Sequence, residues 1–313
     1  MWIYIAKKVL VWIPVLFVTL FIPFMVLIEL SPGDPATFAF IGDATPERIH
    51  EWREFHGPNE PIMHRYIRYI LGLLEGEFSP VPRRGFRVAH NPSITPTVLH
   101  NLPYTLRLIA ISISISLALA IPTGAIAAAK KGEWADKLIK TVAIIGTSTP
   151  VFLLGMILLV MLRPSAVSGL PQHLLLSSFV LGFGMFCALV LYVRASCLEV
   201  AGQSYITTAR AKGLLENKII FKHVLQNVII PTLSAFRDNL GTLFSGVVIV
   251  EFLFNRAGIG RLLMQGILSR DYALALACVV MFIFCYVIIH IVVDIAQGFA
   301  DPWIMRKDAR VAG

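Results

Sequence analysis

The residues of this chain best suited to chemistry lie in one polar segment, TTARAKGLLENKIIFKHVLQN, at positions 207–227. The segment stands out because it carries four cationic side chains within an apolar chain: Arg210, Lys212, Lys218 and Lys222. Apolar residues after Gly213 recur at a spacing that puts them on one helix face, namely Leu215, Ile219, Ile220, Val224 and Val228. Gly213 itself tolerates the positive φ of a sharp turn. The segment is therefore predicted to be a helix–glycine–helix hairpin.

Two roles for this hairpin follow from its pattern. A basic amphipathic helix can rest on anionic membrane lipid. Alternatively, the small side chains of Ala209 and Ala211 allow a partner protein to approach closely, with the cations of Arg210 and Lys212 at the edge of the contact. A docking element of the second kind has to be rigid and fixed to the rest of the chain at both ends.

Two ionisable residues, Arg237 and Asp238, lie at membrane depth. The apolar run Leu240–Phe254 has 15 residues, roughly 22 Å of helix against an apolar bilayer core of about 30 Å. The span must begin earlier, near Asn227, and so include both charges. Each would cost about 2.5–3.5 kcal/mol at the centre of a lipid-facing helix. We expect them to form a structural ion pair or to line a pathway that contacts substrate.

Three further polar residues are expected to play structural roles inside spans. His290 and Asp294 are one helical turn apart and can meet on one face, where a packing hydrogen bond is favoured over a proton relay. Glu251 lies near the outer end of the span that contains Asp238, and is expected to fix the loop that follows.

Catalytic and cofactor motifs are missing from the sequence. It contains no G-x-x-x-x-G-K-[ST], H-E-x-x-H or G-x-S-x-G pattern, and the cysteines at 187, 197, 278 and 285 form no C-x-x-C pair. No catalytic, cofactor or metal site is expected. Without a P-loop, the chain is not expected to bind the phosphates of ATP.

Composition places the chain among all-α polytopic membrane proteins. Of 313 residues, 57% are hydrophobic and 15% charged, and the mean hydropathy is +0.75, whereas soluble domains carry about 25% charged residues. The net charge of +8 is explained by cytoplasmic loops that collect Lys and Arg, so no nucleic-acid partner is expected.

Apolar runs of about 20 residues predict six transmembrane helices. They cover Val9–Leu30, Leu106–Ala129, Leu138–Leu162 with a break at TSTP (147–150), Leu174–Val193, about Asn227–Phe254 and Leu274–Phe299. The first is too long for a signal peptide and is expected to stay as a membrane helix. The short loops rich in Lys and Arg all fall on one side if both termini are cytoplasmic.

The sequence also resembles a known family. The runs TARAKG at 208–213 and HVLQN at 223–227 are similar to the cytoplasmic loop of ABC importer permeases of the oligopeptide/dipeptide/nickel branch. SPGDPA (31–36), HNLPYTLRL (100–108) and EFLFNRAGIGRLL (251–263) resemble other parts of that family in the same order. The chain departs from it at Gln226, where proline is usual, at Ala257 before Gly258, and at Arg237 and Asp238.

This resemblance implies a type I ABC importer (MetI-like) fold. It implies an N-terminal transmembrane helix (1–30), an extracytoplasmic lobe (31–95), a five-helix transmembrane domain (96–300) with a coupling loop at about 199–227, and a cytoplasmic tail (301–313). The expected coupling residues are Thr208, Ala209, Arg210, Ala211, Lys212, Gly213 and Leu214.

The resemblance further implies a permease subunit of a bacterial or archaeal cytoplasmic (inner) membrane. Its expected partners are a second, homologous permease, two ATPases that bind ATP and Mg, an extracytoplasmic binding protein, and lipid. Peptides are the expected substrates, with nickel, a metallophore or another small solute as the alternative. An ion-driven secondary transporter would show two similar halves with matching broken helices, and an intramembrane hydrolase would need the missing motifs.

Overall fold

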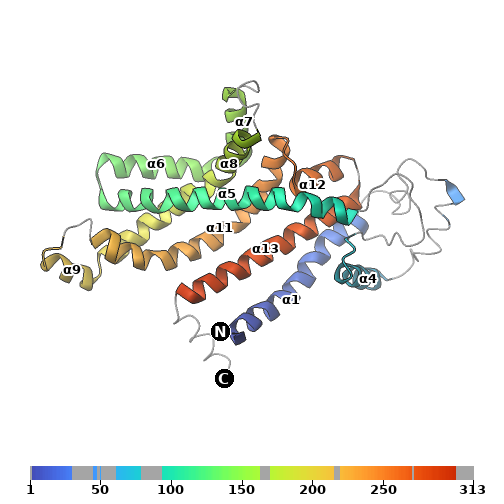
Figure 1. The fold of residues 1–313 in the computed structure, drawn as a ribbon, viewed down its shortest axis with the longest axis horizontal. Coiled ribbons are helices and arrows are strands. Elements are labelled where there is room, and N and C mark those ends of the chain that lie inside the picture. The colour runs from blue at the N-terminus through green and yellow to red at the C-terminus, as the bar shows by residue number, and fades with distance from the viewer. Residues whose placement is uncertain are drawn as a thin grey trace. The chain divides into compact units, whose positions relative to one another are not determined.

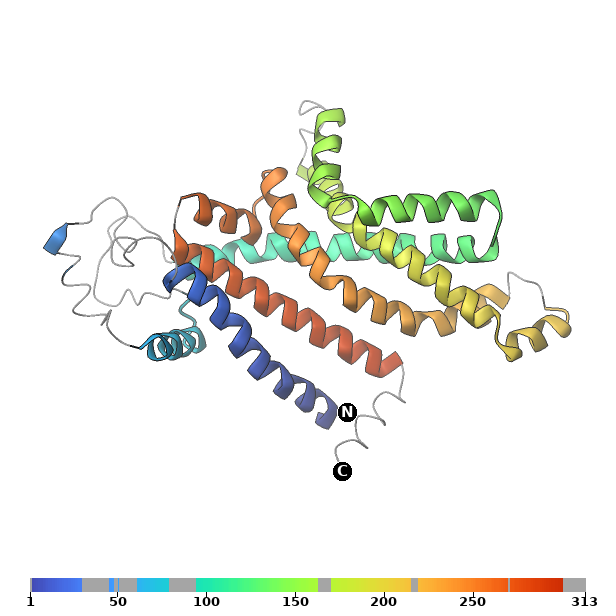
Figure 2. The same ribbon diagram turned by 180° about the vertical axis from the view of Figure 1, so that it is seen from behind.

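The computed structural model describes residues 2–29, 45–47, 50, 61–78, 94–162, 170–214, 219–269 and 271–300, and every regular element among them is a helix (Figures 1 and 2). The chain divides into two compact units. The first comprises residues 1–8, 106–255 and 288–313, and the second comprises residues 9–105 and 256–287.

The first unit is built around α8. It contains α5 (Ile94–Ala129) from Leu106 onward, α6 (Trp134–Ser148), α7 (Val151–Leu162), α8 (Leu170–Ala201), α9 (Ser204–Ala211), η3 (Ile219–Val224), α11 (Leu225–Leu253) and the end of α13 (Tyr272–Ala300). Helices α11, α6 and α7 all pack against α8, with α11 forming the most extensive contact. The buried residues of α8 include Val180, Leu189 and Val193.

Small residues bring α5 and α8 close together. The Ser116 hydroxyl donates to the carbonyl of Gly182 at 2.8 Å, and a Cβ built on Gly182 would lie 2.6 Å from Ser116 Oγ. Close approach through Gly and Ser is how helices associate in membranes, where packing and interhelical hydrogen bonds replace the hydrophobic driving force.

The predicted break at TSTP is present. Helix α6 ends at Ser148 and α7 begins at Val151, and the two are bent by 104°. Thr149 is extended, as expected for a residue before Pro150. The third predicted span is therefore two short helices rather than one interrupted run, although together they still qualify as one broken span or a re-entrant loop.

The second unit has an aromatic centre. It comprises α1 (Trp2–Phe24) from Val9, η1 (Met25–Glu29), α4 (Ile62–Leu74), the first turns of α5, α12 (Ile259–Leu268) and α13 up to Val287. Tyr66 of α4 is fully buried, donates to the carbonyl of Phe17 and lies 5.0 Å from the rings of Phe17 and Phe21. Burial raises the pKa of Tyr66 to about 12, so this donor stays neutral.

The predicted spans are recovered with longer bounds. Helix α5 begins at Ile94 rather than Leu106, α8 continues to Ala201 rather than Val193, and α13 covers Tyr272–Ala300. Among the described residues, four helices are long and apolar enough to cross a membrane, and the bent α6–α7 pair makes a fifth if it counts as one span. Helix α11 has 29 residues, which is roughly 43 Å at 1.5 Å per residue; its length, more than its hydropathy, supports a sixth crossing.

The outer segments are only partly described. Helix α4 lies within the expected extracytoplasmic lobe, and α12 lies between the last two predicted spans. Residues 31–44, 48–49, 51–60 and 79–93 of the expected lobe and the whole of the expected tail, 301–313, lie outside the described residues.

Candidate functional site

The candidate site is the hairpin that begins with α9. This helix ends at Ala211, and Gly213 adopts a φ of +77°. The Gly213 N–H donates to Arg210 O at 2.9 Å, and the Leu214 N–H donates to Ala209 O at 3.4 Å. These two bonds form a Schellman motif, which satisfies the last carbonyls of a helix and requires a left-handed residue after its end. The predicted turn at Gly213 is confirmed.

A buried apolar cluster fixes the hairpin to the rest of the first unit. Ile206 on α9 is fully buried together with Ile219 and Val224 of η3 and Val228 of α11. Ala125 of α5 and Val193 and Cys197 of α8 complete the cluster. Ala209 and Leu214 pack against it, which adds the apolar contact that often accompanies a Schellman motif. The hairpin is therefore held by three helices at once.

The predicted apolar face is confirmed at the residues that the structure describes. Ile219, Val224 and Val228 all point into the cluster, whereas Leu215 lies outside the described residues. The segment Ile219–Val224 is wound as a π-helix before α11 continues as an α-helix. The sequence does not predict this π-helical turn, because the segment has too few apolar residues for their spacing to distinguish a π-helix from an α-helix.

The opposite side of the hairpin is exposed. Thr208, Arg210, Ala211, Lys212 and Gly213 are all accessible. Thr208 Oγ1 donates to the carbonyl of Ser204 at 3.0 Å, and Arg210 Nη1 donates to Ala201 O at 3.4 Å. A rigid base thus presents a small, cationic tip. Such a tip is suited to docking into a cleft, because the turn at Gly213 is already fixed by its own hydrogen bonds.

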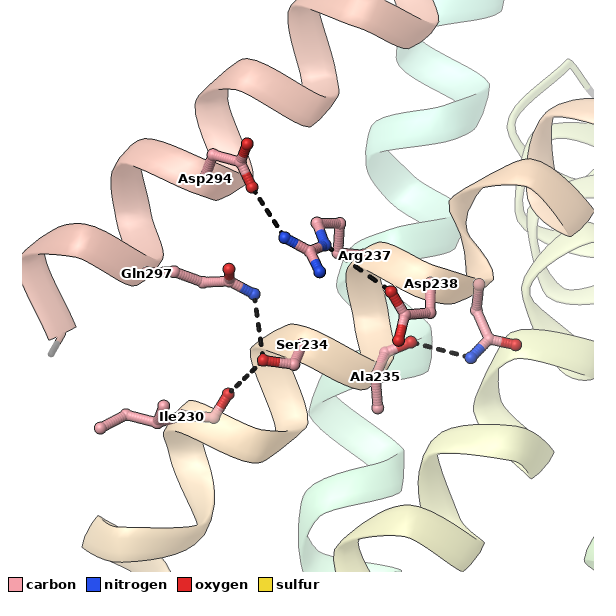
Figure 3. Close-up of polar contacts among 8 residues, drawn as sticks. Ile230, Ser234, Ala235, Arg237, Asp238, Asp294 and Gln297 are labelled. Atoms are coloured by element: carbon pink, nitrogen blue, oxygen red, sulfur yellow. Dashed lines mark hydrogen bonds and ion pairs between the residues drawn. The ribbon is translucent and has the colours of Figure 1, made fainter. Parts of the chain in front are cut away.

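The ionisable residues of α11 meet those of α13 within the first unit (Figure 3). Arg237 Nη1 lies 3.0 Å from Asp294 Oδ1, and Arg237 Nε lies 3.6 Å from Asp238 Oδ1. Side-chain exposure is 8% for Asp294, 35% for Arg237 and 64% for Asp238. Asp294 is therefore neutralised inside the unit, whereas Asp238 faces outward from it.

A second polar contact joins the same two helices one turn away. Gln297 Nε2 donates to Ser234 Oγ at 3.4 Å, and the Ser234 hydroxyl donates to the carbonyl of Ile230 at 3.4 Å (Figure 3). Together with the Arg237–Asp294 pair, these bonds fix the register of α11 against the end of α13.

The structure gives Asp294 a partner that the sequence does not predict. Arg237 of α11 donates a hydrogen bond to Asp294, and the contact expected from His290, one turn earlier on α13, stays a prediction. Arg237 and Asp294 are 57 positions apart, so only the packing of α11 against α13 reveals the pair. Glu251 lies in the last turn of α11 and is fully buried, as its expected structural role requires.

A further ion pair is not predicted by the sequence. Arg194 of α8 donates two hydrogen bonds to Asp136 of α6, from Nε to Oδ1 at 2.6 Å and from Nη2 to Oδ2 at 2.8 Å. The Gly132 N–H also donates to Asp136 Oδ2, at 2.9 Å. Asp136 stands in the first turn of a helix after a glycine, which is a capping signal, but nothing in the local sequence points to Arg194.

Taken together, the described residues form a multi-pass helical membrane chain with an exposed basic hairpin. The chain belongs to the family of binding-protein-dependent transport system inner membrane components. The model of that family matches residues 120–306, and the model of the N-terminal part of these membrane components matches residues 1–109.

Relatives in the same family cover almost the whole chain. The glutathione transport system permease protein GsiC of Shigella boydii serotype 4 (strain Sb227) is 31% identical over 310 residues, 97% of this chain and 99% of the relative. The protein of the same name from Escherichia coli (strain K12) is 30% identical over the same lengths. This chain is therefore an ABC importer permease subunit, a multi-pass protein of the inner membrane.

Membership has direct consequences for partners. A binding-protein-dependent permease implies an ABC ATPase and a substrate-binding protein. Permease components of this family are typically non-catalytic, so the hydrolysis of ATP belongs to the ATPase.

Proposed function

We propose that this chain forms half of a translocation pathway for di- and oligopeptides. A homologous permease supplies the other half, two cytoplasmic ATPases bind ATP and Mg, and an extracytoplasmic binding protein delivers the substrate. The choice of peptides is supported by the two relatives named for glutathione, which is itself a small peptide. The observation that carries the coupling mechanism is the rigid hairpin at Gly213.

In this mechanism residues Thr208 to Leu214 dock into a cleft on the ATPase. Closure of the ATPases upon ATP binding displaces the docked tip. Because Ile206 is buried among residues of α5, α8 and α11, a displacement of the tip moves the ends of these helices rather than bending a loose loop. The alternation of the pathway between outward and inward access then follows the ATP cycle.

The polar residues inside the spans divide into two groups in this proposal. Asp294 and Glu251 are buried and are assigned structural roles, as is His290, which lies one helical turn from Asp294 on α13. Arg237 and Asp238 lie at the edge of the pathway, where the exposed carboxylate of Asp238 faces the water-filled route or the second permease. Both termini and the hairpin lie on the cytoplasmic side, as the distribution of Lys and Arg favours.

The proposal is tested by reconstituting the chain with its partner permease, ATPases and binding protein in liposomes. We expect uptake of dipeptides and glutathione that requires both external binding protein and internal ATP. A matched preparation without the binding protein serves as the control. Uptake by this chain alone, or uptake driven by an ion gradient without ATP, would contradict the proposal.

A further inference from the structure

A cavity of about 450 Å³ lies in the first unit at the break between α6 and α7. Its walls come from the end of α6, the start of α7, and the facing sides of α8 and α11. This size falls within the range of small-molecule sites. No charged side chain is among the described residues that line it; the apolar walls include Phe152, Phe183 and Met185.

Hydroxyl groups that line the cavity bond to the backbone of their own helices. At the end of α6, Thr147 and Ser148 donate to Ile144 O at 2.9 and 3.0 Å, and Thr149 donates to Ile145 O at 2.8 Å. A hydroxyl has one hydrogen but two lone pairs. Each of these hydroxyls donates its hydrogen to a backbone carbonyl of its own helix. Its oxygen can therefore still accept a hydrogen bond from a ligand.

The opposite wall repeats this arrangement on α11. Ser245 donates to Thr242 O at 2.8 Å, and Asn239 Nδ2 donates to Ala235 O at 2.8 Å. The Asn239 Oδ1 is left as an acceptor. The helix ends at the break do not bias the charge of a ligand, because the negative pole of α6 and the positive pole of α7 meet there and oppose each other.

We propose that this cavity is a substrate subsite that binds peptides through their backbone N–H and terminal ammonium groups. The inference rests on the proposed peptide function and adds the class of contact. The neutral acceptor oxygens on the two walls match the hydrogen-bond donors that every short peptide carries. Because none of these acceptors is charged, the subsite holds peptides of different sequence without selecting for their side chains.

The test uses the complete importer in lipid nanodiscs, without binding protein, and trialanine as the probe. Saturation-transfer NMR measures its dissociation constant for the wild type and for the double variant Ser148→Ala/Ser245→Ala. The control double variant is Ser114→Ala/Thr123→Val, because Ser114 and Thr123 make the same hydroxyl bond to their own helix on α5 but lie outside the cavity.

Each lost hydrogen bond weakens binding roughly 2- to 12-fold. We therefore expect the dissociation constant for trialanine to rise at least about fourfold in the cavity variant and to stay unchanged in the control. A trialanine analogue with an ester in place of one of its two amides lacks one donor, so it should bind more weakly to the wild type but lose less affinity in the cavity variant.

Three outcomes would overturn the inference. Trialanine could fail to bind the wild type, the two double variants could bind it with equal affinity, or the cavity variant could lose as much affinity for the ester analogue as for trialanine. The last two would mean that the hydroxyls only satisfy their own helices. Failure of the proposed function is separate, because it would appear as absent ATP-dependent peptide uptake by the wild-type assembly with its binding protein.

Discussion

At the scale of single residues, the hairpin depends on the left-handed conformation of Gly213. A side chain at this position strains the backbone by about 1–2 kcal/mol. Nothing lies within 4 Å of a Cβ built on Gly213, so the strain comes from the backbone and not from a clash. The Schellman bonds to Arg210 O and Ala209 O would be lost if the turn relaxed.

We predict that Gly213→Val uncouples ATP hydrolysis from transport in the reconstituted assembly. The matched control is Gly76→Val, because Gly76 has a φ of +84° and also has nothing within 4 Å of its Cβ position, but lies outside the hairpin. Both variants carry similar backbone strain. The ratio of peptide transported to ATP hydrolysed should fall for the Gly213 variant alone. Equal ratios for the two variants would show that the turn plays no part in coupling.

A second prediction separates shape from charge at the tip. Ala209 packs against the buried cluster, and overpacking such a contact typically costs 1–3 kcal/mol. Lys212 is exposed, and single exposed ion pairs contribute little. We expect Ala209→Trp to weaken ATPase binding strongly and Lys212→Ala to be mild, measured by co-purification of the ATPase at matched membrane insertion. The reverse order would favour a hairpin that rests on lipid through its charges.

At the scale of helices, the Asp136–Arg194 pair ties α6 to α8. The side chains are 5% and 19% exposed, and removing one partner of a buried pair costs about 3–5 kcal/mol because the other charge is left unpaired. Replacing both partners with apolar residues of similar size is often close to neutral.

We predict that Asp136→Leu lowers the thermal stability of the purified assembly far more than Asp136→Leu combined with Arg194→Met. Thermal unfolding followed by size-exclusion chromatography measures both. Arg237→Met is a second test of the same effect. It removes the cation that pairs with the buried Asp294, so it should lower the thermal stability as Asp136→Leu does. If the single and double variants at α6 and α8 unfold at the same temperature, the pair contributes packing rather than charge.

At the scale of the whole molecule, the arrangement in the membrane follows from the basic loops. We predict that single cysteines at positions 131 and 212 react with a membrane-impermeant maleimide only from the cytoplasmic side, and that one at position 74 reacts only from outside. Positions 74, 131 and 212 are exposed, and the four native cysteines are all buried. The native chain is thus its own background control. Labelling of position 212 from outside would overturn the predicted topology.

The helices and the turn at Gly213 could be predicted from local sequence patterns. In lipid, backbone polar groups must be satisfied within the segment, so apolar runs of sufficient length become helices wherever they occur, as α1, α8 and α13 do. The break at TSTP and the turn at Gly213 are equally local, because proline removes an N–H and glycine alone tolerates the left-handed region. Helix ends were less predictable, since polar residues such as those at the start of α5 continue a helix once neighbours pack against them.

The pairing of polar groups, by contrast, depends on how the helices pack and could not be predicted from the sequence. Arg194 and Asp136 are 58 positions apart, and Arg237 and Asp294 are 57 apart, distances over which no sequence period acts. The cavity is likewise formed by α6, α7, α8 and α11 together. The physical reason is that a membrane span fixes the rise along its own axis but not its rotation or its neighbours. Those depend on small residues such as Gly182 and on the packing that they allow.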